Sequence, residues 1–113
     1  MDIYTQIVDN RLIIHLSGEI DHHVVGHIKD KIDKTYTTTN VRDMVFDFSE
    51  ISFMDSSGIG LIMGRYKNLP PGGKLTLVGV ADNIRRVFDL SGLGKFINFE
   101  PSIETVIGGS YVR

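Results

Sequence analysis

The sequence contains no cysteine, so disulfide bonds, thiolate nucleophiles and cysteine-ligated zinc are excluded together. It has no apolar run near the roughly 18 residues that span a bilayer, and no basic N-terminal region followed by an apolar stretch. Basic side chains are not clustered, and the 12 Lys and Arg residues are outnumbered by 14 Asp and Glu residues. Binding of nucleic acid through neutralisation of its phosphates is therefore not expected. We expect a cytoplasmic protein with neither a nucleic-acid nor a membrane partner.

The remaining composition is that of one folded domain. Hydrophobic residues make up 42% of the chain and charged residues 23%, close to the averages of soluble globular proteins. The length of 113 residues fits a single domain, because domains usually contain about 100 to 150 residues. The sequence therefore predicts one domain over residues 1–113, with a flexible tail from about residue 108.

The first part of the chain predicts a β-hairpin followed by a helix. Apolar residues alternate over Ile3–Val8 and again over Leu12–Leu16, and polar residues 9–11 separate the two strands. Asp21 is of a residue type that caps helices by accepting hydrogen bonds from free N–H groups. The apolar positions of the helix that follows are Val24, Val25, Ile28 and Ile32. We expect this helix to end near residues 37–40, where three threonines and an asparagine disfavour it.

The second part of the chain alternates strands and helices. Strands are predicted at Met44–Phe48, Leu75–Val80 and Phe96–Phe99, with helices at Ile59–Leu69, from Asp82 to Gly92 and after Pro101. The segment MVFDF is apolar on both faces apart from its aspartate, which is typical of a central strand covered on both sides. Helical crossovers require parallel pairing of the strands that they connect. The sequence therefore predicts an α/β fold of order β-β-α-β-α-β-α-β-α with a mixed, mostly parallel sheet.

The segment Phe53–Gly60 lies between the central strand and a helix, at the carboxyl edge of the sheet, where ligands of open α/β folds bind. Its polar residues 55–57 fit a helix N-cap, which contributes about 1 kcal/mol. They also fit a phosphoserine, because unpaired N–H groups and the helix dipole stabilise an added anion. A phosphate on Ser56 would add about −1.5 to −2 charges. We expect it to act on a docking partner and to leave the fold of the domain nearly unchanged.

Three motifs follow one another along the chain, namely GEIDHH at Gly18–His23, FMDSSGIGLIMGRYK at Phe53–Lys67 and FDLSGLGKF at Phe88–Phe96. Together they closely resemble the STAS domain family, in particular its anti-sigma factor antagonists of the sporulation type, over essentially the whole chain. The resemblance implies a small STAS fold and a non-enzymatic protein that switches partners. The unphosphorylated antagonist would bind an anti-sigma factor that is also a serine kinase of the GHKL ATPase type, and so release a sporulation sigma factor. Phosphorylation would weaken this complex, and a PP2C-type phosphatase would restore it.

The same resemblance assigns roles to particular residues. It places the phosphorylation on Ser56, the first serine of the DSSG motif. The residues that match the family's partner-binding positions are Asp21, His22, Asp55, Ser57 and Gly58. In such proteins the loop that carries Asp21 and His22 lies beside the phosphorylated serine. Gly60 and Gly64, four residues apart on the following helix, would either leave a flat stripe for a partner or pack against the domain's own neighbours.

Other chemistries have less support in the sequence. His23 and His27 are four residues apart, a spacing that allows two imidazoles to share a zinc ion, but no third ligand is assured. The nucleophile elbow G-x-S-x-G is absent around Ser56 and Ser57, so a small serine hydrolase is only the alternative from another class. An antagonist in a general stress response is the alternative within the same fold. No catalytic residue, metal or cofactor is predicted.

Overall fold

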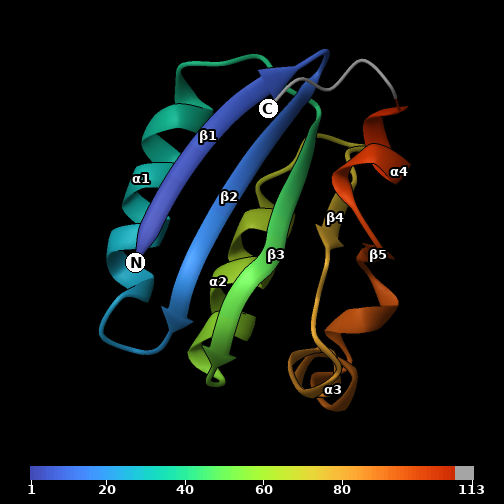
Figure 1. The fold of residues 1–113 in the computed structure, drawn as a ribbon. Helices are drawn as coiled ribbons and strands as arrows, with labels where there is room; N and C mark the ends of the chain where they lie inside the picture. Colours follow the sequence, from blue (N-terminus) through green and yellow to red (C-terminus); the bar gives the residue numbers. More distant parts are fainter. Residues whose placement is uncertain (109–113) are drawn as a thin grey trace.

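The computed structural model describes residues 1–108, which form five strands, four α-helices and one short 3-10 helix (Figure 1). Their bounds are β1 (Asp2–Val8), β2 (Arg11–Ile20), α1 (Val25–Thr37), β3 (Asp43–Met54), α2 (Ser57–Lys67), β4 (Leu75–Val78), α3 (Asp82–Ser91), η1 (Leu93–Lys95), β5 (Asn98–Glu100) and α4 (Ile103–Ile107). The predicted order of strands and α-helices is confirmed. None of the helices in this part of the chain is both long and apolar enough to cross a membrane. Beyond Gly108, the predicted flexible tail lies outside the described residues.

The strands form one sheet in the order β1-β2-β3-β4-β5. The hairpin strands β1 and β2 are antiparallel, whereas β2 to β5 pair in parallel with their neighbours. The mixed, mostly parallel sheet is therefore confirmed, and β3 lies at its centre as the MVFDF segment predicts. Because β2 and β3 are parallel, both end at the same edge of the sheet, the lower one in Figure 1.

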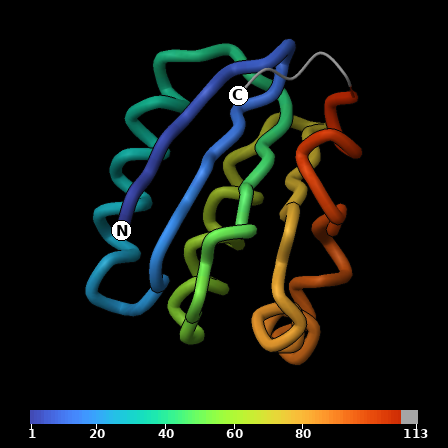
Figure 2. The backbone as a smooth tube through the Cα atoms, in the orientation of Figure 1, coloured from blue at the N-terminus to red at the C-terminus, as the bar shows by residue number. Residues whose placement is uncertain are grey.

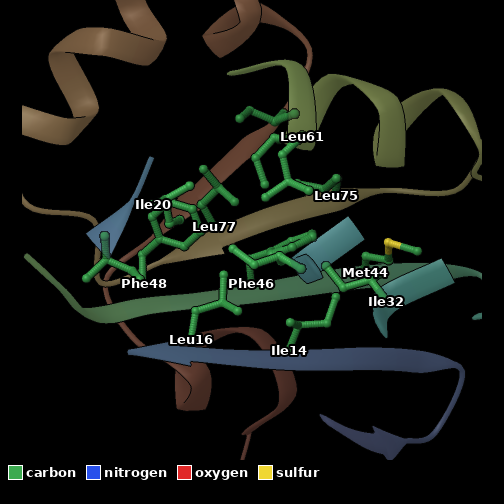
Figure 3. Packing of buried hydrophobic residues seen from close by; sticks show 14 of the residues in the cluster. Ile14, Leu16, Ile20, Ile32, Met44, Phe46, Phe48, Leu61, Leu75 and Leu77 are labelled. Carbon is green, nitrogen blue, oxygen red and sulfur yellow. The ribbon is translucent and has the colours of Figure 1, made fainter. Parts of the chain in front are cut away.

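The main core lies between the sheet and the helices α1, α2 and α3. Side chains from alternate positions of the strands, among them Ile14, Leu16, Phe46 and Phe48, fill this space (Figure 3). The intervening positions point to the other face of the sheet. There a smaller cluster contains Ile13, Val45, Val78, Ile103 and Ile107, the last two from α4. The period of two along each strand thus separates two packed layers.

Strands β2 and β3 extend beyond the residues that their alternating pattern predicts. The pairing of β2 with β3 shifts register between His15 and Ser17 and again between Gly18 and Glu19, and Gly18 has a positive φ of 115°. Such irregularities insert extra residues and break the period of two, and the alternating pattern of the sequence therefore ends at Leu16 although the strand continues. The extension brings the ends of β2 and β3 into register, with Ile20 opposite Met54.

The prediction of a last strand at Phe96–Phe99 was displaced by two residues. The strand β5 begins at Asn98, and Phe96 follows η1. The N–H of Phe96 donates to the carbonyl of Leu93 over 2.9 Å, so it closes the 3-10 turn and does not pair with β4. The side chain of Phe96 is 63% exposed as a result.

Candidate functional site

The loops that follow β2 and β3 lie side by side at the lower edge of the sheet (Figure 2). The N–H of Asp55 donates to the carbonyl of Ile20 over 3.0 Å, which continues the parallel pairing by one residue. The loop that carries Asp21 and His22 is therefore adjacent to the DSSG turn. These are the two segments that the sequence assigned to one site.

The carboxylate of Asp55 joins the two loops. Its Oδ1 accepts hydrogen bonds from the N–H of Ser57 over 2.9 Å and from the Ser57 hydroxyl. Its Oδ2 accepts the N–H of His22 over 3.2 Å and lies 3.7 Å from Nδ1 of the His22 ring. The hydrogen bond from the Ser57 hydroxyl is the main reason why the pKa of Asp55 is below its ordinary value, and the bonds from the two N–H groups and the His22 ring act in the same direction. Asp55 thus carries a negative charge at neutral pH.

The two adjacent serines have different environments. Ser57 is half-buried, and its hydroxyl is held by Asp55. Ser56 is exposed at the N-cap of α2, and its hydroxyl makes no hydrogen bond with the described residues. Only the Ser56 hydroxyl is therefore free to react with a phosphoryl donor without breaking a contact within the site.

The N-terminal N–H groups of α2 are less available than the sequence suggests. The N–H of Ser57 donates to the Asp55 carboxylate, and the N–H of Gly58 donates to the Asp55 carbonyl over 3.1 Å. The Asp55 carboxylate thus satisfies the first amide of α2, and the hydroxyl of Ser56 at the N-cap position satisfies none. A phosphate on Ser56 would be stabilised by the dipole of α2 and by solvent, with these two amides already paired.

Asp21 caps the turn of residues 22–24 that leads into α1, whereas the N-cap of α1 itself is Val24, which has no side-chain cap. The Oδ1 of Asp21 accepts the N–H groups of His23 over 2.9 Å and Val24 over 3.2 Å. The regular helix α1 begins one residue later, at Val25. The ring of His22 is 71% exposed and lies 4.0 Å from the ring of His23. Most of the His22 ring is therefore open to solvent.

The three glycines of the site differ in their surroundings. Gly58 is buried, and a Cβ atom there would lie 2.5 Å from Cγ of Met54. At Gly60 and Gly64, in contrast, a Cβ would meet no heavy atom within 4 Å. Gly58 therefore permits the turn to pack on the core, whereas the backbone at Gly60 and Gly64 is open to a close approach from outside.

The described residues give little support to a zinc site or to a serine hydrolase site. Among residues 1–108, no group of three His, Asp or Glu side chains is placed to hold a metal ion, so His23 and His27 have no third ligand there. Neither serine hydroxyl is hydrogen-bonded to a histidine in this part of the chain, because Ser57 donates to a carboxylate and Ser56 has no side-chain partner. Within residues 1–108, neither serine of the DSSG motif thus forms a serine–histidine pair.

The fold is shared with proteins of a known family. The family model of the STAS domain matches residues 2–106. The chain therefore belongs to the STAS domain family, and the fold predicted from the sequence motifs is confirmed.

Several relatives within this family have named functions. An anti-sigma F factor antagonist of Lysinibacillus sphaericus is 38% identical over 87 residues, which cover 76% of this chain and 74% of the relative. An anti-sigma-B factor antagonist of Listeria monocytogenes is 30% identical over 98 residues, which cover 86% and 84%.

The solved structures extend this similarity to the fold. The anti-sigma factor antagonist SpoIIAA in its unphosphorylated form matches with a TM-score of 0.79 at 34% identity, over 93% of each chain. The Bacillus cell fate determinant SpoIIAA in its phosphorylated form matches with a TM-score of 0.71 at 34% identity, over 93% of this chain and 96% of that one. The fold of this chain is thus similar to both forms of SpoIIAA.

Proposed function

We propose that this chain is an anti-sigma factor antagonist that is inactivated by phosphorylation of Ser56. The observation that carries the proposal is the exposed Ser56 hydroxyl at the start of α2, next to a Ser57 hydroxyl that Asp55 holds. The relatives that are named as anti-sigma factor antagonists, and the phosphorylated form of SpoIIAA, support it.

In this proposal, the partner is an anti-sigma factor that is also a serine kinase of the GHKL ATPase type. The unphosphorylated chain binds the kinase and releases the sigma factor. A change from mostly bound to mostly free requires roughly a hundredfold loss of affinity, about 2.7 kcal/mol. A phosphate of about −1.5 to −2 charges beside the Asp55 carboxylate can supply this, since docking would have to desolvate two adjacent negative groups. A PP2C-type phosphatase then restores binding.

The residues around Ser56 have different roles in binding. Asp55 and Asp21 fix the shapes of the two loops through their hydrogen bonds, and the exposed ring of His22 contacts the partner. The backbone at Gly60 and Gly64 lets the partner approach α2 closely. Ser57 keeps the Asp55 carboxylate in place through its hydroxyl. Gly58 contributes indirectly, because it lets the turn pack against Met54 in the core.

We assign the chain to the sporulation type. The GEIDHH segment favours this type, and the identity to the anti-sigma F factor antagonist exceeds that to the anti-sigma-B factor antagonist. The second candidate is an antagonist of the general stress response, which the similarity to the anti-sigma-B factor antagonists supports. Measuring the affinity of the unphosphorylated chain for an anti-sigma F factor and for an anti-sigma-B factor by calorimetry distinguishes them. Tighter binding of the anti-sigma F factor is expected.

The test of the switch compares variants of Ser56. We expect Ser56→Asp to bind the anti-sigma factor at least about tenfold more weakly than the wild type, a loss of roughly 1.4 kcal/mol, measured by calorimetry. Ser56→Ala should bind like the wild type but accept no phosphate when it is incubated with the kinase and ATP. Intact mass and fragment sequencing show whether and where the phosphate is added.

Asn10→Asp is the matched control, because it adds the same charge at an exposed position in the turn between β1 and β2, at the opposite end of β2 from the site. It should bind within twofold of the wild type. Equal affinities of the wild type and Ser56→Asp would contradict the switch. Phosphate still added to Ser56→Ala would move the site to another residue, with Ser57 as the first candidate.

A further inference from the structure

Among the described residues, the two most exposed large apolar side chains belong to Leu90 and Phe96. Leu90 on the last turn of α3 is 83% exposed, and Phe96 after η1 is 63% exposed. The ring of Phe96 lies 6.4 Å from the ring of Tyr66 on α2, centroid to centroid. Tyr66 and Phe96 thus form an aromatic pair at the surface, where their contact with water is unfavourable.

Positive charge flanks this aromatic pair. Lys67 follows Tyr66 in sequence and Lys95 precedes Phe96, and both lysines are exposed. Neither makes an ion pair with another described residue. We call Tyr66, Lys67, Lys95 and Phe96 the distal patch. An apolar centre with a positive rim complements an acidic protein surface that presents an apolar side chain, although the chain as a whole has a net charge of −2.

The helix α2 connects the distal patch with Ser56. Tyr66 lies ten residues after Ser56, which corresponds to about 15 Å along a helix. Between them are Gly60 and Gly64, where no heavy atom of the domain would meet a Cβ. Lys67, seven residues after Gly60 and three after Gly64, lies on the same face of α2 as these glycines. A partner that docks at Ser56 and follows this face therefore reaches the distal patch at Lys67.

We propose that the distal patch is a second contact surface for the anti-sigma factor, which meets it with acidic side chains around an apolar anchor. This inference rests on the proposed function, because it takes the partner from there. Substitutions more than about 10 Å apart that contact no common residue contribute nearly additively to free energies. The distal patch therefore contributes the same factor to binding whether or not Ser56 carries a negative charge.

The experiment measures the affinity of the full chain for its anti-sigma factor by calorimetry. We expect Phe96→Ser and Lys95→Glu each to weaken binding at least fivefold, and the Lys95→Glu complex to depend less on salt than the wild-type complex. Ile7→Ser is the matched control, since Ile7 on β1 is 52% exposed and lies at the opposite edge of the sheet. It should bind within twofold of the wild type. Unchanged thermal unfolding of each variant shows that the fold is intact.

A double-mutant cycle completes the test. Phe96→Ser should weaken binding by the same factor in the wild-type background and in the Ser56→Asp background. If Phe96→Ser and Lys95→Glu bind like Ile7→Ser, the distal patch is not a contact surface, while a difference between wild type and Ser56→Asp still supports the switch. If Phe96→Ser weakens the binding of the wild type but not that of Ser56→Asp, the distal patch is not an independent contact surface. Failure of the wild type to bind any anti-sigma factor instead refutes the proposed function itself.

Discussion

His15 and Asp47 form a buried polar pair on the face of the sheet opposite α1, α2 and α3. The His15 Nδ1 lies 2.8 Å from Oδ2 of Asp47, and its Nε2 lies 3.1 Å from Oε1 of Gln6. The Oδ1 of Asp47 accepts the N–H of Ser49 over 3.0 Å and the Ser49 hydroxyl over 2.7 Å. The ring of Tyr4 stacks on His15 with centroids 5.1 Å apart. The single aspartate of the MVFDF strand is therefore buried with partners at both of its oxygens.

Burial by itself would raise the pKa of Asp47, but the hydrogen bonds from Ser49 and His15 outweigh it and lower the pKa below the ordinary value of 3.8. Ionised Asp47 therefore stabilises the fold above that pH, and this stabilisation is lost as the pH falls through the lowered pKa. We expect Asp47→Asn to reduce the free energy of unfolding at pH 7 by about 1–3 kcal/mol. The difference from the wild type should shrink below about pH 4.

Urea denaturation at pH 7, 5 and 3 measures this dependence. Asp9→Asn is the control, because Asp9 pairs with Arg11 at the surface, where its side chain is 71% exposed. It should change the free energy of unfolding at pH 7 by less than about 1 kcal/mol. A loss for Asp47→Asn that is the same at all three pH values would show that its charge is not responsible.

At the scale of elements, the sequence predicted the framework better than the ends of the strands. The period of two located the hairpin, because alternate residues of β2 face the main core, and the period of three to four located the helices, because each packs an apolar face on the sheet. It did not predict the extension of β2 past Leu16, since the register shifts around Gly18 interrupt the alternation. Nor did it predict the exposure of Phe96, which an apolar pattern alone assigns to a strand.

For the site too, the sequence predicted the location but not the contacts within the turn. The DSSG motif located it, and the parallel pairing of β2 with β3 explains why the loop with Asp21 and His22 is adjacent. The different roles of Ser56 and Ser57 within the motif depend on side-chain geometry. Which serine is free and which is held by Asp55 follows from a contact that composition and spacing do not determine.

The glycines of α2 give a prediction at this scale. Gly58→Ala should destabilise the domain by about 1–3 kcal/mol, because the new Cβ would overlap Met54 in the core. Gly60→Ala should instead stabilise it by up to about 1 kcal/mol, since the site is open and alanine is the better helix former. Urea denaturation measures both. In calorimetry, Gly60→Ala should bind the anti-sigma factor more weakly than the wild type despite its greater stability. If Gly58→Ala instead stabilised the domain, the Met54 side chain would be able to move away from the new Cβ without loss of free energy.

At the scale of the whole molecule, the proposed binding face and the core are separate. Ser56 projects from the edge of the sheet, whereas the packed side chains of the main cluster lie between the sheet and the helices. The side-chain hydrogen bonds that join the turn to the neighbouring loop are made by Asp55 and not by the Ser56 hydroxyl. A charge on Ser56 can therefore change the electrostatics of the surface without removing a contact on which the fold depends.

Phosphorylation should accordingly leave the backbone of the domain almost unchanged. We expect amide chemical shifts of the phosphorylated and unphosphorylated chain to differ mainly at residues 54–60 and at His22, whose N–H donates to the same Asp55 carboxylate. Residues of α4 and β1 serve as internal controls, because these elements lie away from the edge that carries Ser56 (Figure 1). Large shift changes in α4 or β1 would mean that the phosphate remodels the domain and does not act as a surface block. If the amide shift of His22 changes while those of α4 and β1 do not, the phosphate charge acts through the Asp55 contact and its effect ends at the neighbouring loop.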